Sequence, residues 1–96
     1  SAAKAAVIGY VRALAAALDG TGVTANAICP GSTRGAMLEA SAAVYGLPDQ
    51  EKFAEQQLTR RLLEPAEVAE AIGWLCSPAG SGCTGAVIPV DGGLTV

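Results

Sequence analysis

The chain has 96 residues, enough for one small domain at most, and a domain of this size buries only somewhat more than about 60% of its unfolded surface. Its residues are 51% apolar and 16% charged, whereas the surface of a small soluble domain is about 25–35% charged. The composition therefore predicts that a longer chain, further subunits or both cover part of the molecule. A net charge of −3 and the lack of a basic patch argue against a nucleic-acid surface, and no apolar run approaches the roughly 20 residues of a membrane span.

The N-terminal residues 1–19 are predicted to form a helix, and Gly20–Gly22 ends it. Small residues on its other faces predict that neighbouring segments cover this helix all round. Lys4 is unexpected in the first turn, because a helix N-terminus carries partial positive charge. The helical spacing is carried by the larger apolar residues Val7, Val11, Leu14 and Leu18.

A short strand is predicted over Val23–Cys29, apolar on nearly both faces, which is typical of a central strand in a parallel sheet. Pro30-Gly31 breaks the regular pattern at the carboxyl end of this strand. The residues from about 35 to 58 are only weakly helical and are expected to form a mobile flap. Within the flap, Asp49 is a candidate cap for a short helix over Glu51–Leu58.

A second helix is predicted over Glu64–Ser77, with Pro65 in its first turn and an inward stripe of Val68, Ile72 and Leu75. A last short strand, Ala86–Val90, precedes a glycine turn that begins at Asp91. One carboxylate makes a poor metal cage, so this turn is not expected to bind metal. Strand, helix and strand imply a parallel pair with a crossover connection, and two strands cannot bury both faces of a sheet. The fold class is therefore α/β, as the end of a larger sheet in the order helix, strand, flap, helix, strand.

Three cysteines, Cys29, Cys76 and Cys83, form no Cys-x-x-Cys pair, and the sequence has no histidine. These features argue against a zinc site and predict no metal centre. An odd number of cysteines in apolar surroundings predicts reduced thiols and a cytoplasmic protein. We identify no signal peptide, because the start has no basic segment and a helical pattern continues where cleavage would fall.

The sequence contains four motifs, which follow one another along the chain. "SAAKAA" is similar to the tail of a Tyr-x-x-x-Lys motif, and "VTANAICPG" to the strand before an Asn-x-x-x-Pro-Gly turn. "RLLEPAEVAEAIGWLCSP" and "TGAVIPVDGG" are similar to a last helix and a last strand. Together they resemble, over residues 1–96, the carboxyl-terminal portion of a short-chain dehydrogenase/reductase, a single-domain family of NAD(P)-dependent oxidoreductases. The resemblance implies a Rossmann-like doubly wound parallel sheet. The general likeness is to enzymes of the 3-oxoacyl-thioester reductase type, and "STRGAMLEASAAVYGL" is similar to the mycofactocin-associated subgroup.

The resemblance gives Lys4 a catalytic role. In this family a lysine one helical turn after the catalytic tyrosine lowers the pKa of the phenol from about 10 and holds the nicotinamide ribose. That tyrosine would lie one residue before Ser1, and the upstream serine, asparagine and glycine-rich nucleotide motif are also absent from the 96 residues. The alternative is an ordinary solvated lysine.

The same resemblance places the cofactor against the turn after the first strand, where amide and carbonyl groups near Thr33 would hold the carboxamide. The family commonly has a threonine facing the pyrophosphate where this chain has Gly35, so Ser32 or Thr33 is the expected substitute. The alternative is an ordinary Pro-Gly turn. The candidate cofactor-binding residues are Lys4, Pro30, Gly31, Ser32, Thr33 and Gly35.

The flap corresponds to the substrate-binding loop of the family, and its apolar residues either line a pocket or close a lid onto the core. Arg34 is a candidate for binding a phosphate or carboxylate, whereas solvated charge is the favoured interpretation of Arg60 and Arg61. The candidate pocket residues are Met37, Leu38, Val44 and Tyr45.

The predicted function is hydride transfer between NAD or NADP and a small alcohol or carbonyl compound, in a dimer or tetramer without nucleic-acid or membrane partners. The residue that selects between the two cofactors is not in this sequence. The 96 residues alone are expected to be inactive. The rival hypothesis is a non-catalytic, truncated relative that acts through oligomerisation.

Overall fold

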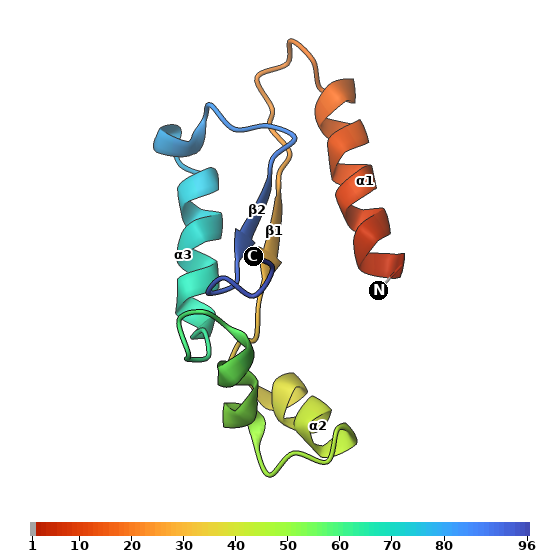
Figure 1. Cartoon of the computed structure of the whole chain (residues 1–96). Coiled ribbons are helices and arrows are strands. Elements are labelled where there is room, and N and C mark those ends of the chain that lie inside the picture. The colour runs from red at the N-terminus through yellow and green to blue at the C-terminus, as the bar shows by residue number, and fades with distance from the viewer. Residues whose placement is uncertain (1) are drawn as a thin grey trace. The chain divides into compact units, whose positions relative to one another are not determined.

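The computed structural model describes residues 2–96 and has an α/β fold with a small parallel sheet (Figure 1). Ser1, the first residue of the predicted N-terminal helix, lies outside the described part. Among the described residues, no helix is both long and apolar enough to cross a membrane. The elements are α1 (Ala2–Ala17), β1 (Ala27–Pro30), α2 (Ala36–Val44), the 3-10 helix η1 (Gln50–Gln56), α3 (Pro65–Leu75), the 3-10 helix η2 (Pro78–Gly80) and β2 (Val87–Val90).

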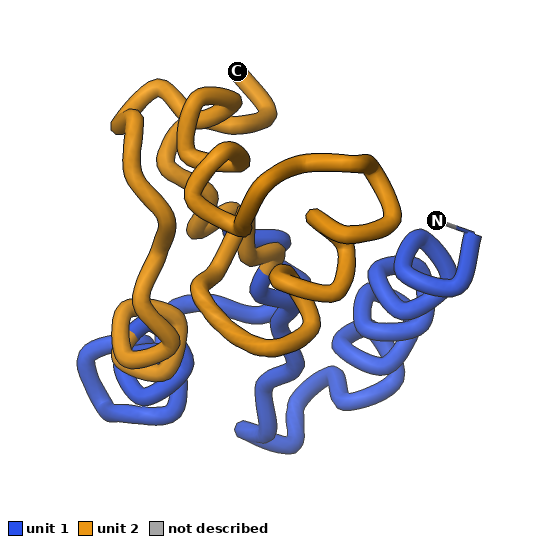
Figure 2. Tube along the Cα trace, turned by 90° about the horizontal axis from the view of Figure 1, so that it is seen from below, with its two compact units in different colours: residues 1–28, 71–88 blue, residues 29–70, 89–96 orange. Residues whose placement is uncertain are grey.

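The chain divides into two compact units, coloured blue and orange in Figure 2. Unit 1 comprises residues 1–28 and 71–88, and unit 2 comprises residues 29–70 and 89–96. Each strand begins in unit 1 and ends in unit 2.

The strands begin in unit 1, where the N–H of Ala27 donates to the carbonyl of Ala86 at 2.9 Å. The predicted strand start at Val23 is wrong, because β1 begins at Ala27. The side chain of Asn26 explains the late start: its Oδ1 accepts from the N–H of Ala86 at 3.0 Å and its Nδ2 donates to the carbonyl of Cys83 at 3.0 Å. At Asn26 a side chain thus takes bonds that a longer ladder would have used, and regular pairing begins at the next residue, Ala27, four residues after the predicted start.

Helix α1 carries no buried residue among the described part of the chain, and the exposed fraction of Val7 is 58%. Residues 2–96 therefore do not supply the cover that the sequence predicts for this helix. The helix ends before Gly20 and Gly22, which adopt φ values of 74° and 78° that favour glycine.

Unit 2 has its own small core, in which α2 and η1 pack together. Asp49 caps η1 as predicted, because its Oδ1 accepts from the N–H of Glu51 at 3.0 Å. The predicted extent of this helix is wrong: η1 is a 3-10 helix that stops at Gln56, since Gln57 adopts an extended backbone. The core consists of Ala42, Phe53 and Leu62, with Leu38, Leu47 and Ala54 packed against them.

Helix α3 is shorter than predicted and begins at Pro65. The carboxylate of Glu67 accepts from the N–H of Glu64 at 2.7 Å, which is the N3-to-N-cap half of a capping box. At the other end, the helix stops at Leu75, and the hydroxyl of Ser77 donates to the carbonyl of Trp74 at 2.6 Å. Both ends are therefore set by side chains that bond to backbone groups.

Candidate functional site

The turn after β1 lies in unit 2 and is held on both sides by backbone hydrogen bonds. The N–H of Gly31 donates to the carbonyl of Val90 at 3.0 Å. The N–H of Leu63 donates to the carbonyl of Ser32 at 2.9 Å, and the N–H of Arg34 donates to the carbonyl of Leu63 at 2.8 Å. These two bonds form a parallel bridge between Thr33 and Leu63.

The bridge decides where the backbone of Thr33 points. In a parallel ladder, the residue between two such bonds directs its own N–H and C=O away from the partner segment. Thr33 is half-buried, and its hydroxyl donates to the carbonyl of Gly31 at 3.0 Å. One backbone donor and one backbone acceptor therefore face away from Leu63, side by side, on a fixed turn. This pair fits a planar primary amide, which offers one acceptor and one donor.

Gly31 is required by close packing in this turn. A Cβ atom at this position would lie 2.7 Å from the Cα of Asp91 and 2.8 Å from its Cβ. Asp91 itself is buried, and its carboxylate accepts from the hydroxyl of Thr95 at 2.7 Å and from the N–H of Gly93 at 3.0 Å. These hydrogen bonds lower the pKa of Asp91, and the bond from Thr95 has the largest effect. Asp91 thus shapes a turn, and the described residues contain no acidic, histidine or cysteine cluster able to hold a metal.

Gln57 is the residue of this region that the sequence analysis missed. It is 1% exposed, the only large side chain among the described residues that is fully buried. Its Oε1 accepts from the N–H of Ser32 at 2.7 Å, and its Nε2 donates to the carbonyl of Arg61 at 2.6 Å. No sequence signal distinguishes it from its neighbour Gln56, which is exposed.

Arg34 meets carboxylates of its own chain. Its guanidinium pairs with Glu51 and, at 2.9 Å, with Glu64, and these two hydrogen bonds raise the pKa of Arg34. Arg61 binds Glu67 through two nitrogens, at 2.7 and 2.9 Å, so it is paired as well as exposed to solvent. The hydrogen bond from Arg61, together with the N–H of Glu64, lowers the pKa of Glu67 to about 2.

Gly35 closes the turn before α2. Its N–H donates to Oε1 of Gln50 at 2.9 Å, and the N–H of Gln50 in turn donates to Glu39 at 3.2 Å. The amide of Gly35 is thus occupied. Ser32 and Thr33 are the two predicted side-chain contacts to phosphate. The hydroxyl of Thr33 already donates to Gly31, whereas the hydroxyl of Ser32 makes no hydrogen bond among residues 2–96.

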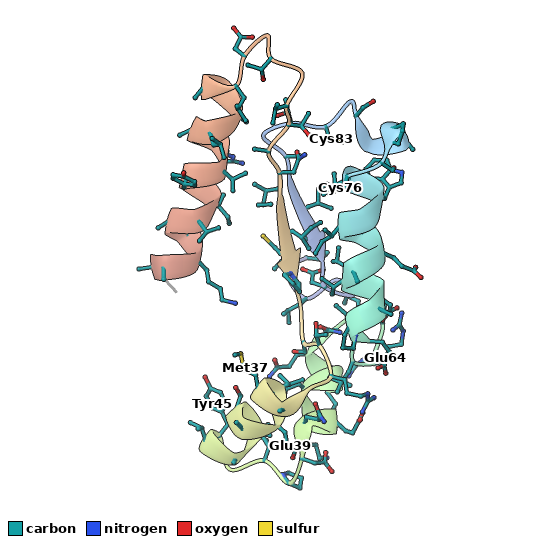
Figure 3. All side chains as sticks on the ribbon, turned by 180° about the vertical axis from the view of Figure 1, so that it is seen from behind. Met37, Glu39, Tyr45, Glu64, Cys76 and Cys83 are labelled. Atoms are coloured by element: carbon teal, nitrogen blue, oxygen red, sulfur yellow. The ribbon has the colours of Figure 1, made fainter. Side chains whose placement is uncertain are left out.

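The four predicted pocket residues differ in their burial. Leu38 packs against the core, whereas three others are exposed. Figure 3 labels Met37, on α2, and Tyr45, the residue directly after α2. The ring of Tyr45 meets that of Phe53 edge to face, with centroids 6.4 Å apart. The exposed fractions are 85% for Met37, 82% for Val44 and 73% for Tyr45.

Lys4 lies in the first turn of α1, in unit 1, and is exposed. The other candidate cofactor residues lie in unit 2, where the structure brings them together in one turn. They are Pro30, Gly31, Ser32, Thr33 and Gly35.

Comparison with known proteins gives one family for the whole chain. Residues 1–95 match the family model described as Enoyl-(Acyl carrier protein) reductase. A curated relative is the A-factor type gamma-butyrolactone 1'-reductase (1S-forming) of Streptomyces virginiae, 40% identical over 94 residues, which are 97% of this chain and 36% of the relative.

Two solved structures share the fold. A crystal structure of actinorhodin polyketide ketoreductase with NADPH matches with a TM-score of 0.90 and 30% identity, over 97% of this chain and 38% of that one. A short-chain dehydrogenase/reductase of Brucella melitensis, described as a glucose/ribitol dehydrogenase, matches with a TM-score of 0.84 and 32% identity, over 99% of this chain and 37% of that one. The chain spans little more than a third of the length of the relatives it matches. The sequence motifs, the α/β fold and these matches agree, and the chain belongs to the short-chain dehydrogenase/reductase family.

Proposed function

We propose that residues 1–96 are the carboxyl-terminal segment of a single-domain, NAD(P)-dependent oxidoreductase that interconverts an alcohol and a ketone or aldehyde. The observation that carries the proposal is the backbone of Thr33, whose N–H and C=O face away from Leu63 on a turn fixed from both sides. Family membership supplies the cofactor class, since the related ketoreductase structure contains NADPH.

The residues of the turn fit a nicotinamide. The N–H of Thr33 matches the carboxamide oxygen, and the C=O of Thr33 matches the carboxamide nitrogen. Gly31 and Pro30 set the path of the backbone that leads to Thr33. Ser32 is the residue we assign to the phosphate side, because the hydroxyl of Thr33 and the N–H of Gly35 already donate within the chain.

When bound, the nicotinamide supplies or accepts the hydride. We assign to Lys4 the electrostatic part of the proton transfer. A tyrosine one helical turn earlier, immediately before Ser1, would exchange the proton of the alcohol, and its phenol ordinarily titrates near 10. The Lys4 ammonium stabilises the phenolate, lowers that pKa toward neutrality and donates to the nicotinamide ribose.

Exposed apolar residues on α2 and directly after it support a pocket wall for the substrate, formed by Met37, Val44 and Tyr45. Leu38 has a different role in this proposal, because it anchors α2 on the core. The matched relatives are named as a gamma-butyrolactone reductase, a glucose/ribitol dehydrogenase and a polyketide ketoreductase, and these names support an alcohol/carbonyl substrate. The 3-oxoacyl-thioester and mycofactocin-associated subgroups are narrower forms of the same proposal.

We also propose a cytoplasmic dimer or tetramer. The three cysteines are free, as expected for a reducing compartment. The apolar surface left exposed by α1 favours cover by further chain or by another subunit.

The experiment that tests the proposal uses the natural protein as its gene encodes it, with its intact mass measured first. Consumption of NADH and NADPH is followed with a panel of ketones, aldehydes and 3-oxoacyl thioesters, and the reverse reaction with the matching alcohols. We expect saturable turnover with one cofactor. A folded protein that binds neither cofactor would favour the rival hypothesis of a non-catalytic module that acts through oligomerisation.

A further inference from the structure

We propose that Gln57 is a positioning residue for the nicotinamide carboxamide: by its two hydrogen bonds, to Ser32 and Arg61, it fixes the Ser32–Thr33 backbone in the orientation that receives this group. The inference rests on the proposed function. It assigns a role to a side chain that lies outside every motif through which the chain resembles its family.

The environment of Gln57 is one in which a polar side chain needs both bonds. At 1% exposure, neither end of the amide is compensated by solvent. The N–H of Ser32 can only donate and the carbonyl of Arg61 can only accept, so these partners determine which end of the amide is Oε1 and which is Nε2. Of the uncharged side chains of this length, only glutamine offers an acceptor and a donor at once.

Two glycines leave room for this side chain. A Cβ atom at Gly31 would lie 2.5 Å from Oε1 of Gln57, and one at Gly92 would lie 3.0 Å from Nε2. Gly31 belongs to the turn after β1 and Gly92 to the turn after β2, so both turns close over the same amide. Position 31 therefore has to be glycine partly because a larger residue would collide with the amide of Gln57.

Gln57 acts on Thr33 through Ser32. The N–H of Ser32 is held by Gln57, and the C=O of Ser32 is held by the N–H of Leu63. The C=O of Ser32 and the N–H of Thr33 share one planar peptide unit and point in opposite directions. The N–H of Ser32 belongs to the peptide unit before Ser32, and its C=O belongs to the peptide unit after it. Because both units are held, the backbone around Ser32 is fixed and the N–H of Thr33 points away from Leu63. Loss of Gln57 frees the first of these restraints.

The test compares Gln57→Met with the matched control Gln56→Met in the natural protein. Three ligands are titrated: the preferred reduced cofactor, its acetylpyridine analogue, in which an acetyl group replaces the carboxamide, and the corresponding ADP-ribose, which lacks the nicotinamide. We expect Gln57→Met to weaken cofactor binding about 10-fold, the size expected from an unsatisfied buried N–H, and to leave ADP-ribose binding within about twofold. In Gln57→Met, the ratio of the affinities for the cofactor and for its acetylpyridine analogue should also fall. In Gln56→Met, none of these affinities should change.

Gln57→Glu provides a second test that a merely structural role would not pass. A carboxylate keeps an acceptor for Ser32 but places a second acceptor against the carbonyl of Arg61. At mildly acidic pH the protonated carboxyl again donates to Arg61. Cofactor binding should therefore be weak at alkaline pH and recover as pH falls, while wild type shows no such recovery. The neighbouring Asp91 keeps its charge over this range, because its hydrogen bonds hold its pKa below the ordinary value, and Arg61 stays protonated.

The outcomes separate the two proposals. If the wild-type protein binds neither NADH nor NADPH, both the proposed function and the role of Gln57 are overturned. If wild type binds a cofactor but Gln57→Met weakens ADP-ribose as much as the whole cofactor, or if Gln57→Glu shows no recovery in acid, only the role of Gln57 is overturned.

Discussion

At the scale of single residues, Gly31 carries the tightest packing in the candidate site. A Cβ atom there would stand 2.7 Å from the backbone of Asp91, a distance that real Cβ contacts essentially never show. We predict that Gly31→Ala lowers the free energy of unfolding by about 1–3 kcal/mol, the usual cost of overpacking, and weakens cofactor binding as the turn shifts.

The measurement is urea denaturation of the natural protein, with Gly73→Ala as control. Gly73 lies inside α3 with nothing within 4 Å of an added Cβ, so alanine there should leave stability unchanged or raise it by up to about 1 kcal/mol. Equal stability of Gly31→Ala and wild type would contradict the packing argument.

Lys4 is the second residue on which the account depends. If its ammonium lowers the pKa of the catalytic phenol, Lys4→Met should reduce kcat by about 100-fold or more and move the pH at which activity rises toward the ordinary phenol value near 10. Steady-state rates across pH check this, with Lys4→Arg expected to retain part of the effect. Arg12→Met, at another exposed cation of α1, should stay within roughly twofold of wild type. A pH profile unchanged by Lys4→Met would contradict the assigned role.

Residues that belong to a sequence motif could be predicted as site residues. Residues whose role depends on being buried against distant parts of the chain could not. Two strong breakers at the end of an apolar run predict the end of the strand at Pro30-Gly31, and the structure ends β1 one residue later than predicted, at Pro30. The close approach of Gly31 to the backbone of Asp91 was not predictable from the sequence. Gln57 could not be found in this way, because glutamine is usually exposed and its burial depends on contacts with Ser32 and Arg61, 25 residues before it and 4 after it. Asn26 belonged to a recognised motif, but its bonds to Cys83 and Ala86 also required the fold.

At the scale of elements, the start of α3 combines a cap with an ion pair. Glu67 binds Arg61 and accepts from the N–H of Glu64, and its pKa is about 2 instead of 4.5. Because the pKa in the folded state is the lower one, this contribution to stability is complete above pH 4.5 and is lost as pH falls toward 2.

We therefore predict that Glu67→Gln makes the protein less sensitive to acid between pH 4.5 and about 2, although it is less stable than wild type near neutral pH. Glutamine keeps an acceptor for Glu64 but has no charge to lose. The melting temperature as a function of pH checks this, with Glu70→Gln, at an exposed position of the same helix, as control. A parallel fall of the two melting curves, wild type and Glu67→Gln, would exclude Glu67 as the titrating group.

Helical periodicity and capping residues predicted the existence of α1, α3 and the capped turn at Asp49, because these signals are local in sequence. Boundaries were less predictable. The strand β1 starts four residues later than its apolar run, and directly before this start the N–H of Ala86 donates to the side chain of Asn26 in place of a ladder bond. The helix η1 ends early because Gln57 is drawn into a buried position. In both cases a distant partner decided the boundary.

At the scale of the whole molecule, unit 1 exposes an apolar cavity of about 580 Å³. Its wall includes Val7, Val11 and Leu14 of α1, together with Ile72 and Cys76. Exposed Tyr10 and Trp74 add to the apolar surface of the same unit. Large exposed apolar patches are rare on free-standing proteins, so the apolar wall of this cavity indicates a covered face.

We predict that this face is covered in the natural protein, by further chain or by another subunit. Cys76 is exposed in the 96 residues and reports on the cavity. Its reaction with a thiol reagent, followed by peptide mass spectrometry, should be at least about 10-fold slower in the folded natural protein than after denaturation. Reaction of Cys76 at the rate of the denatured protein would mean that the cavity stays open.

The most direct test of the account is a titration of the natural protein with NADH and NADPH, followed by calorimetry and by nicotinamide fluorescence. We predict saturable binding of one cofactor per chain, weakened when the carboxamide is replaced by an acetyl group, because the backbone of Thr33 then loses one of its two partners. A correctly folded protein that binds neither cofactor, or that does not distinguish the carboxamide from the acetyl group, would contradict the central claim that this turn holds a nicotinamide.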